Sequence, residues 1–388
     1  MKVLYICNRG EIGGATKAIL NTIKELKKNK IEPIVITPNK NSYVQKECDQ
    51  MNVECHYIKY YEIGYAFNDF DFKKFIKLLI MPFLWLLNII VNNNSISKIN
   101  KVINFDEIDF IHSNTNRDNF GVMLSQKYRK RHIMHLREFD TDFFNLKYLK
   151  KDIYKYFDEN TTVFIAVSNA IKDYYIKKGI DKNKIVVVYD GIDDKNIKFK
   201  KDYSYKEKIK ILMLSNIAEN KGQIQLIEAI NLMNNEIKSK IFVDFYGTGS
   251  NTYIEKLKKV IKNYNLENQF NFLGYSNNVY DIVKNYDIGI TASKIEGFGM
   301  VTVEYMLSGL PVIVSDTGAN IEIIRNNYNG LVYKYGDCND LKSKICSLVN
   351  DKNKSEKLAI QAMNDANEKY TIGRNCIELE KIYLNLKS

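Results

Sequence analysis

Two glutamates, Glu296 and Glu304, stand eight residues apart across a glycine-aromatic-glycine turn, Gly297-Phe298-Gly299. Glycine lets a ligand approach the backbone closely, and a helix expected to start near Gly299 offers unpaired N–H groups and its positive dipole end to a phosphate. Glu304 lies about 7.5 Å further along that helix, at roughly 1.5 Å per residue. The spacing therefore predicts a clamp for a sugar nucleotide, with the diphosphate at the helix start, the ribose at Glu304 and the sugar at Glu296.

The residues that follow this turn strengthen the prediction. The helix is expected to stop at Gly309, and the sequence Gly-Leu-Pro-Val at 309–312 opens a buried strand that leads to Gly318. Residues 296–318 together resemble the Glu-x7-Glu motif of the retaining, family 4 glycosyltransferases. The resemblance covers nearly the whole chain and is most specific from Gly274 to Gly330. It implies an α/β protein of the GT-B fold, with two Rossmann-like, doubly wound parallel-sheet domains that face each other across a cleft.

A second segment resembles the same family but departs from it at one position. Asn216 and Lys221 follow an expected strand and precede a helix, where the family has an Arg-x4-Lys-Gly sequence. The resemblance implies that these positions hold the donor diphosphate and stabilise it as it leaves, a task that electrostatics favours in a site with little water. Asn216 cannot neutralise charge, which leaves more of this task to Lys221. Arg9, Arg137 and Arg325 are alternative sources of the missing cation.

Glycine-rich loops at other strand ends are expected to complete the donor site. Gly247 and Gly274-Tyr275 resemble the loops that line the nucleotide pocket in this family, although ordinary strand-end turns would have the same composition. Gly13-Gly14 could approach a phosphate, but it does not fit G-x-G-x-x-G, which argues against a dinucleotide dehydrogenase. The donor-binding residues implied by the resemblance are Gly13, Gly14, Asn216, Lys221, Gly247, Gly274, Tyr275, Gly297, Phe298, Gly299, Met300, Val301 and Glu304.

All four histidines, His56, His112, His132 and His135, lie in the first half of the chain and do not form a metal-ligand set. His135 matches the position where related enzymes place a histidine that faces the donor sugar, while a histidine satisfied at a strand end is the alternative. His112 is expected to be structural. The resemblance implies catalytic roles for Glu296, His135 and Lys221, with no protein nucleophile, no metal and no cofactor beside the nucleotide-sugar co-substrate.

Composition sets wider limits. The 388 residues exceed one ordinary core, and six cysteines without a C-x-x-C pair are typical of reduced thiols in a cytosolic protein. The chain opens with a strand pattern in place of a signal sequence, so we expect a cytoplasmic location. A net charge of +11 suits nucleic acid, an anionic membrane or phosphorylated substrates, but no nucleic-acid-binding signature is present, which argues against nucleic acid.

Strand and helix patterns alternate in two runs, as in parallel sheets covered by helices. We expect an acceptor-side domain at 1–198, a nucleotide-sugar-binding domain at 199–370 and a final helix at 371–388, joined by a charged connection at 193–208. The resemblance implies that the final helix crosses back to the first domain. The expected strands of the two runs are 2–8, 31–37, 53–59, 109–113, 133–136, 162–167 and 184–189, and then 208–216, 240–247, 270–274, 287–293 and 309–312.

The apolar run at 75–91 could contact a membrane. A lysine, a proline and an asparagine interrupt it, and its apolar portion from Leu78 is shorter than the roughly 17 to 25 residues needed to span a bilayer. Two interpretations remain: a long helix that covers the first sheet, or an interfacial helix with Trp85 at headgroup depth and Lys73, Lys74 and Lys77 near anionic lipid, on the inner face of the membrane.

The resemblance implies an enzyme that transfers a hexose, with retention, from a nucleotide-diphosphate donor to a hydroxyl of a surface polysaccharide, a lipopolysaccharide or a lipid-linked glycan. Two alternatives stay open. A non-catalytic nucleotide-sugar-binding partner subunit is favoured by Asn216, and a sugar-nucleotide epimerase would use the same architecture. The presence of both Glu296 and Glu304 argues for transfer. The donor base, the sugar and the acceptor are not readable from these motifs.

Overall fold

The chain divides into two compact units. The computed structural model describes residues 1–7, 13–66, 73–143, 146–195, 197, 199, 203, 208–276 and 279–387. One unit consists of Met1–Gly191 and Ile372–Ser388, and the other of Ile192–Thr371. The connection expected around residue 200 and the loop that contains Arg9 lie wholly or partly outside the described residues.

The first unit contains a seven-stranded parallel sheet in the order β3-β2-β1-β5-β6-β8-β9. The order reverses between β1 and β5, so the carboxyl ends of these two strands flank the topological switch point of the sheet. The strands are β1 (Lys2–Ile6), β2 (Glu32–Thr37), β3 (Glu54–Tyr57), β5 (Phe110–Ser113), β6 (Arg131–Leu136), β8 (Val163–Ala166) and β9 (Ile185–Val187).

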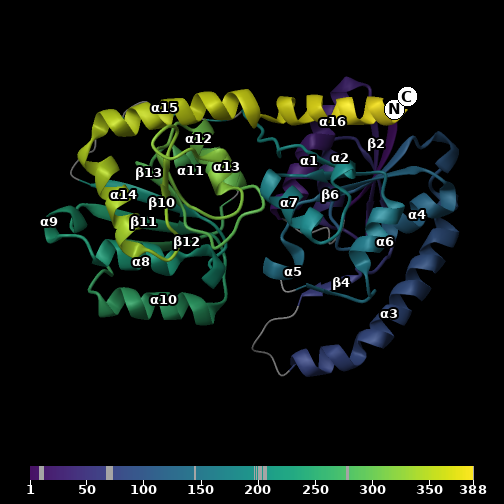
Figure 1. Ribbon diagram of the computed structural model, residues 1–388, viewed down its shortest axis with the longest axis horizontal. Helices are drawn as coiled ribbons and strands as arrows, with labels where there is room; N and C mark the ends of the chain where they lie inside the picture. The colour runs from purple at the N-terminus through teal and green to yellow at the C-terminus, as the bar shows by residue number, and fades with distance from the viewer. Residues whose placement is uncertain are drawn as a thin grey trace. The chain divides into compact units, whose positions relative to one another are not determined.

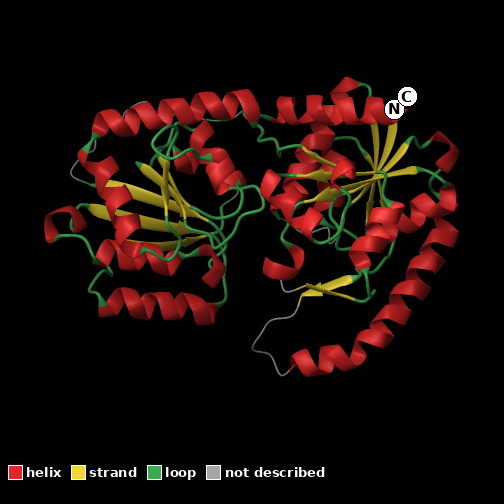
Figure 2. Ribbon diagram, in the orientation of Figure 1, coloured by secondary structure: helices red, strands yellow, loops and turns green. Residues whose placement is uncertain are grey.

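Helices cover both faces of this sheet, because alternate residues of its strands are apolar on each side (Figure 2). Helices α1, α2 and α16 share one buried cluster, while α4 and the end of α3 share the other. The helical elements are α1 (Gly14–Leu26), η1 (Lys27–Asn29), α2 (Tyr43–Gln50), α3 (Lys73–Lys98), η2 (Ile99–Lys101), η3 (Phe105–Glu107), α4 (Phe120–Tyr128), α5 (Asp140–Phe143), α6 (Ile153–Asn160), α7 (Asn169–Lys177), η4 (Lys182–Lys184) and α16 (Ile372–Lys387).

Two features of the first unit were not expected from the sequence. Strands β4 (Gly64–Ala66) and β7 (Leu146–Tyr148) form a small antiparallel pair, and strands of three residues leave too short a pattern to recognise. The apolar run forms part of α3, which contains Pro82 and is longer than predicted. Figure 1 shows α3 along the outer edge of the first unit, with its N-terminal part extending beyond the sheet. Within the described parts of the chain, no helix is long and apolar enough to cross a membrane.

The second unit contains a six-stranded parallel sheet in the order β12-β11-β10-β13-β14-β15, with its switch point between β10 and β13. The strands are β10 (Ile209–Leu214), β11 (Ile241–Tyr246), β12 (Phe270–Gly274), β13 (Ile288–Thr291), β14 (Val312–Ser315) and β15 (Leu331–Tyr333). Helices α8, α10 and α14 pack on one face of this sheet in a single buried cluster. The helical elements are η5 (Glu219–Lys221), α8 (Gln223–Asn231), α9 (Asn235–Lys238), α10 (Asn251–Asn263), α11 (Val279–Val283), α12 (Met300–Leu307), α13 (Asn320–Ile323), α14 (Cys338–Asn350) and α15 (Lys352–Lys369).

The final helix α16 returns to the first unit, as predicted. It packs against α1, where the Thr22 hydroxyl bonds the Asn375 side-chain oxygen at 3.0 Å. The Tyr383 hydroxyl lies 3.1 Å from that of Tyr5 on β1, and both rings are fully buried. The architecture of two doubly wound parallel sheets with a returning C-terminal helix is therefore the predicted one.

Candidate active site

Two of the predicted catalytic residues meet at the switch point of the second sheet. Lys221 ends the short helical turn after β10, and Glu296 lies in the loop after the neighbouring strand β13. The Lys221 Nζ lies 2.5 Å from the Glu296 Oε1, and both side chains are about one-fifth exposed. The Ser293 hydroxyl donates to the same carboxylate oxygen at 2.6 Å. The structure thus joins two residues 75 positions apart into one ion pair that a ligand can still reach.

Backbone contacts fix the loops that carry this pair. The Lys294 N–H donates to the Asn220 carbonyl at 2.7 Å, which ties the β13 loop to the β10 loop. Gly318, in the loop after β14, has φ 57°, and a Cβ there would lie 2.4 Å from the Glu296 carbonyl oxygen. Only glycine permits this close approach without a shift of the backbone. The Ala319 N–H then donates to the same Glu296 carbonyl at 2.9 Å, so Glu296 is positioned from both sides.

Helix α12 begins beside this pair. Gly299 is its N-terminal neighbour in the left-handed conformation, with φ 91°, and no side chain caps the helix start. Met300, Val301 and Glu304 lie half-buried along α12. The N–H groups and the dipole of an uncapped helix start attract an anion. Phe298 differs from the others: its ring is buried and packs against Tyr370 at 5.7 Å, so only its backbone faces a ligand.

The glycine loops after β11 and β12 adopt conformations that glycine favours. Gly247 has φ 141°, and a Cβ there would lie 1.9 Å from the Ser215 carbonyl oxygen, so this loop packs directly on the β10 loop. Gly274 has φ 71° with open space beside it, and Tyr275 next to it is about half exposed. Because β12, β11 and β10 are neighbours in the sheet, these loops lie on the same edge as Lys221.

Of the three arginines considered as replacements for the missing cation at Asn216, the structure describes Arg137 and Arg325, and both are already paired. Asn216 is exposed, and its carbonyl accepts from the Gln223 side chain at 2.9 Å. Arg137 is buried in the first unit and bonds both Asp190 oxygens, at 2.5 and 2.6 Å. Arg325 is paired with Asp365 at 3.0 Å. Both guanidinium groups already have carboxylate partners, which leaves Lys221 and the α12 start as the predicted elements that can hold an anion at this edge.

In the first unit, His135 ends β6 within a buried chain of hydrogen bonds. Its Nδ1 lies 2.9 Å from the His112 Nε2 and 3.4 Å from the Arg137 Nη2. The His112 Nδ1 lies 2.7 Å from the Tyr383 hydroxyl, which in turn contacts Tyr5. Gly13 and Gly14 lie at the start of α1, where Gly13 has an extended backbone and the helix has no side-chain cap.

An arginine side chain can only donate hydrogen bonds, so the contact of Arg137 with His135 sets the direction of the hydrogen bonds in this buried chain of side chains. The His135 Nδ1 must accept, so the His112 Nε2 donates to it, and the His112 Nδ1 accepts from Tyr383. The proton of His135 therefore lies on Nε2, a buried atom without a hydrogen-bond partner among the described residues. Burial, followed by the charge of Arg137, lowers the pKa of both histidines well below its usual value, which keeps both rings neutral.

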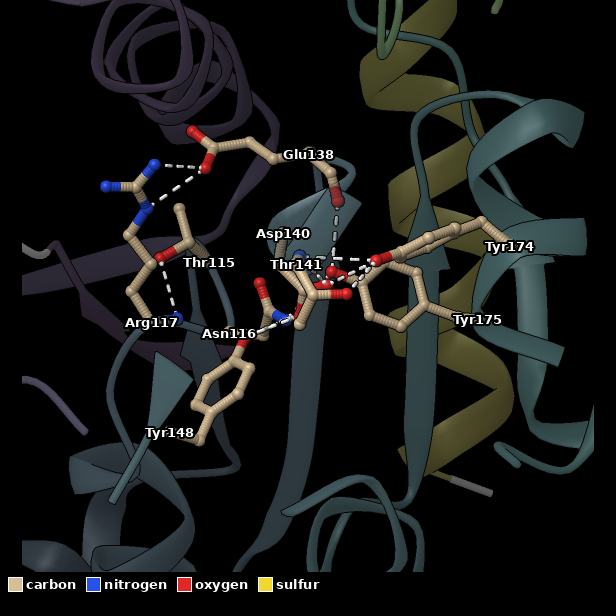
Figure 3. A network of polar contacts seen from close by, with 9 residues as sticks. All are labelled: Thr115, Asn116, Arg117, Glu138, Asp140, Thr141, Tyr148, Tyr174 and Tyr175. Atoms are coloured by element: carbon tan, nitrogen blue, oxygen red, sulfur yellow. Dashed lines mark hydrogen bonds and ion pairs between the residues drawn. The ribbon is translucent and has the colours of Figure 1, made fainter. Parts of the chain in front are cut away.

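A network around Asp140 holds the chain that follows β6 (Figure 3). The fully buried Asp140 carboxylate accepts from Asn116 at 2.9 Å and from Tyr174 at 2.8 Å, and Tyr148 and Tyr154 also donate to it. Nearby, Arg117 donates to the Glu138 Oε2 through both its Nε and its Nη2, at 3.0 and 2.5 Å. A buried carboxylate is stable when enough donors surround it, so these bonds fix the loop beyond His135.

Sequence reasoning missed three polar contributors to these two sites, namely Ser293, Asp140 and Tyr383. Ser293 lies three residues before Glu296, and this short spacing was a signal that could have been used. Tyr383 lies on the last helix, and no sequence pattern links it to His112. Among the described residues, no three His, Cys, Asp or Glu side chains cluster as a metal site would require.

Comparison with known proteins identifies families and structures that this chain resembles. Residues 194–365 match the family model of glycosyl transferases group 1, and residues 12–196 match that of glycosyltransferase family 4. The uncharacterized glycosyltransferase MJ1178 of Methanocaldococcus jannaschii is 27% identical over 387 residues, covering 97% of this chain and 95% of that protein. The chain is 26% identical over 365 residues, 89% of each protein, to the N,N'-diacetylbacillosaminyl-diphospho-undecaprenol alpha-1,3-N-acetylgalactosaminyltransferase of Campylobacter jejuni.

Among solved structures, HepE of Anabaena in complex with UDP superimposes with a TM-score of 0.81 at 19% identity, covering 99% of this chain and 100% of HepE. HepE has also been solved with UDP-glucose. At this identity the likeness shows the fold, which is the predicted GT-B fold. The two family models together extend over both units and confirm the family that the segment 296–318 predicted. The chain is a nucleotide-sugar-dependent glycosyltransferase of family 4.

Proposed function

We propose that this protein is a retaining hexosyltransferase that takes its sugar from a uridine diphosphate donor. The observation that carries the proposal is the Lys221–Glu296 pair at the switch point of the second sheet, beside the uncapped start of α12. A pair with one-fifth of its surface exposed can exchange its internal contact for contacts with a ligand. HepE, which has the same fold, was solved with UDP and with UDP-glucose, and this supports uridine as the base.

In this proposal, different residues of the second unit bind different parts of the donor. Lys221 and the N–H groups at the start of α12 hold the diphosphate, and Glu304 accepts hydrogen bonds from the ribose. The loops at Gly247, Gly274 and Tyr275 line the base. Glu296 holds hydroxyls of the sugar once Lys221 turns to the phosphate.

Retention follows when the acceptor attacks from the face that the nucleotide leaves. The new bond forms between the acceptor oxygen and the anomeric carbon, the bond from that carbon to the phosphate oxygen breaks, and the departing phosphate takes the acceptor's proton. Lys221 stabilises the charge that develops on the leaving diphosphate. The neutral His135, whose proton lies on the buried Nε2, is the first unit's candidate hydrogen-bond donor to a sugar hydroxyl.

We further propose that the acceptor is a glycan attached to a membrane lipid and that α3 rests on the membrane surface. The Campylobacter relative is named for an acceptor on diphospho-undecaprenol. In α3, Phe83, Trp85, Leu86 and Ile90 are all about half exposed or more. Apolar side chains with a tryptophan on one exposed helix suit the headgroup boundary of a bilayer.

Nucleotide release tests the proposal. The full chain incubated with UDP-glucose or UDP-N-acetylglucosamine is expected to release UDP, slowly in buffer and faster with a lipid-linked glycan. GDP and ADP sugars serve as controls, and each donor should raise the melting temperature only if it binds the folded state. Stabilisation by UDP without any release of UDP under either condition would identify a non-catalytic binding subunit instead.

A further inference from the structure

A cavity of about 610 Å³ lies beside β3, at the edge of the first sheet. The residues that line it are far in sequence from the donor residues predicted in the second unit. Strands β2 and β3 are parallel, with Thr37 opposite Tyr57, and the Ile58 N–H donates to the Thr37 carbonyl at 3.0 Å. Both strands therefore leave the sheet at its carboxyl edge, where the cavity forms. The residues that line the cavity include two lysines and four tyrosines, Lys40, Tyr57, Lys59, Tyr60, Tyr61 and Tyr65.

The cavity combines aromatic faces with positive charge. The Lys40 Nζ lies 5.2 Å from the centre of the Tyr57 ring, and the Lys59 Nζ lies 5.6 Å from that of Tyr61. Both lysines are exposed, and Glu62 is the acidic residue among the described residues of the wall. Tyrosine rings present a flat apolar face to the C–H face of a sugar, and lysine ammonium groups bind phosphate as point charges. Rings and lysines together fit a phosphorylated sugar.

Tyr60 anchors the cavity wall in the core of the first unit. Its ring is 4% exposed and stacks on Phe120 at 4.5 Å, with only 5° between the ring planes. Phe120 begins α4 and belongs to the same buried cluster as Tyr60. The stacked ring therefore holds the neighbouring Lys59 and Tyr61 in place at the cavity.

Helix α3 connects this cavity to the apolar surface described above. Asn88 and Asn92 are buried and bond the backbone of Tyr61 at 2.9 Å each, and the Ser95 hydroxyl donates to the Lys59 carbonyl. At about 100° per residue, Phe83, Leu86 and Ile90 project from the opposite side of the helix. One helix thus holds the cavity wall on one side and exposes an apolar stripe on the other. The apolar run contains Asn88 because that residue clamps the wall.

We propose that this cavity binds the sugar phosphate of a lipid-linked acceptor, with Lys40 and Lys59 on the phosphate and the tyrosine rings on the sugar. That this ligand is the acceptor rests on the proposed function, whereas the binding of a sugar phosphate in the cavity does not. The cavity begins at β2, three strand positions from β6 and His135, or about 14 Å at roughly 4.8 Å per strand. The cavity therefore holds the lipid-proximal sugar, and the attacked hydroxyl belongs to a more distant part of the acceptor.

Calorimetric titration of the full chain tests the binding directly. N-acetylglucosamine 1-phosphate should bind, while N-acetylglucosamine and inorganic phosphate alone should each bind more weakly. The double variant Lys40→Ala, Lys59→Ala should weaken the sugar phosphate by about tenfold, the effect expected from a lost charge-assisted contact. Lys182→Ala, another exposed lysine of the first unit, is the matched control. Equal affinity in the wild type and the double variant overturns the site.

Binding to vesicles distinguishes a lipid-linked phosphate from a free sugar phosphate. Phosphatidylcholine vesicles that contain undecaprenyl phosphate should sediment more of the wild-type protein than plain phosphatidylcholine vesicles do. The double lysine variant should lose this preference, and Phe83→Ser, Leu86→Ser should lose binding to both. A wild type without the preference overturns the lipid-linked assignment. UDP binding, measured in parallel, separates the outcomes: if UDP binds and the sugar phosphate does not, the cavity assignment fails while the proposed function stands.

Discussion

The two sheets carry their polar residues in opposite ways. In the second unit, Lys221 and Glu296 form a partly exposed pair on loops, held by backbone contacts. In the first unit, His135, His112 and Tyr383 lie in a buried chain, and the Arg137–Asp190 pair beside them is almost fully buried. A partly exposed pair can change partners when a ligand arrives, whereas a buried hydrogen-bonded network is held in one arrangement. We therefore expect the pair in the second unit to exchange contacts when a ligand binds, and the buried network in the first unit to keep its side chains in one arrangement.

This difference separates the effects of mutation. Changes in the buried network of the first unit should appear mainly as lost stability, and changes in the exposed pair of the second unit mainly as lost turnover. The variants below test this distinction.

The largest effect is expected at Asp190. Asp190→Ala leaves the buried Arg137 without a carboxylate, and removal of one partner of a buried ion pair lowers the free energy of unfolding by about 3 to 5 kcal/mol. Urea denaturation measures this loss. Glu159→Ala, which breaks the exposed pair with Lys155, should change stability by less than about 0.5 kcal/mol. A similar loss in both variants would contradict the distinction.

Turnover should respond most at Lys221. We expect Lys221→Ala to lower turnover by roughly 10²- to 10³-fold, the scale of one lost transition-state charge contact, with little change in stability. Steady-state release of UDP provides the measurement, and Lys259→Ala, an exposed lysine on α10, is the control. Unchanged turnover in Lys221→Ala would sink the assignment of the donor site.

A smaller effect is expected at the C-terminal helix. Tyr383→Phe removes the donor to the His112 Nδ1 and should lower the free energy of unfolding by about 1 to 3 kcal/mol. Tyr5→Phe leaves that bond in place and is the matched control. Nitrogen NMR shifts of the histidine rings should report a proton on the His135 Nε2 in the wild type and in Tyr5→Phe. A proton on the His135 Nδ1 in the wild type would contradict the assigned direction of the chain.

The pH dependence of stability gives the smallest single-residue effect. Burial lowers the pKa of His132 to about 3, so the unfolded chain takes up a proton below about pH 6.5 that the folded protein does not, and stability falls as the pH falls. His112 and His135 act in the same direction. Asp118 opposes them with one proton, because burial raises its pKa to about 7 and its contribution is lost as the pH rises.

His132→Gln isolates one of these protons. Between about pH 4 and pH 6 the variant should lose about 1.4 kcal/mol per pH unit from the slope of unfolding free energy against pH. Urea denaturation at several pH values measures the slope, and His56→Gln, at a half-buried position, is the control. A slope identical to that of the wild type in His132→Gln would show that this ring is not held neutral in the folded state.

The polar residues of the second unit were easier to predict from the sequence than those of the first, because more of them lie close together along the chain. The segment from Glu296 to Gly318 contains a turn, a helix start and a strand in continuous order, so its spacing alone is enough to predict a donor site. Alternating strand and helix patterns likewise predicted both sheets. The His112–Tyr383 contact joins residues 271 positions apart, and no local pattern encodes it. Asn88 was read as a break in an apolar run because its partners, the backbone groups of 61 and 62, can be seen only in three dimensions.

The return of α16 to the first unit also sets the order in which the chain can mature. The second unit, Ile192–Thr371, is one continuous stretch, so all of its contacts are available once the ribosome has passed it. The first unit lacks α16, and with it the Tyr383 hydroxyl that supports His112, until residues 372–387 emerge. The unit whose synthesis starts first is therefore completed after the second unit, and the geometry around His135 is finished only once α16 has been made.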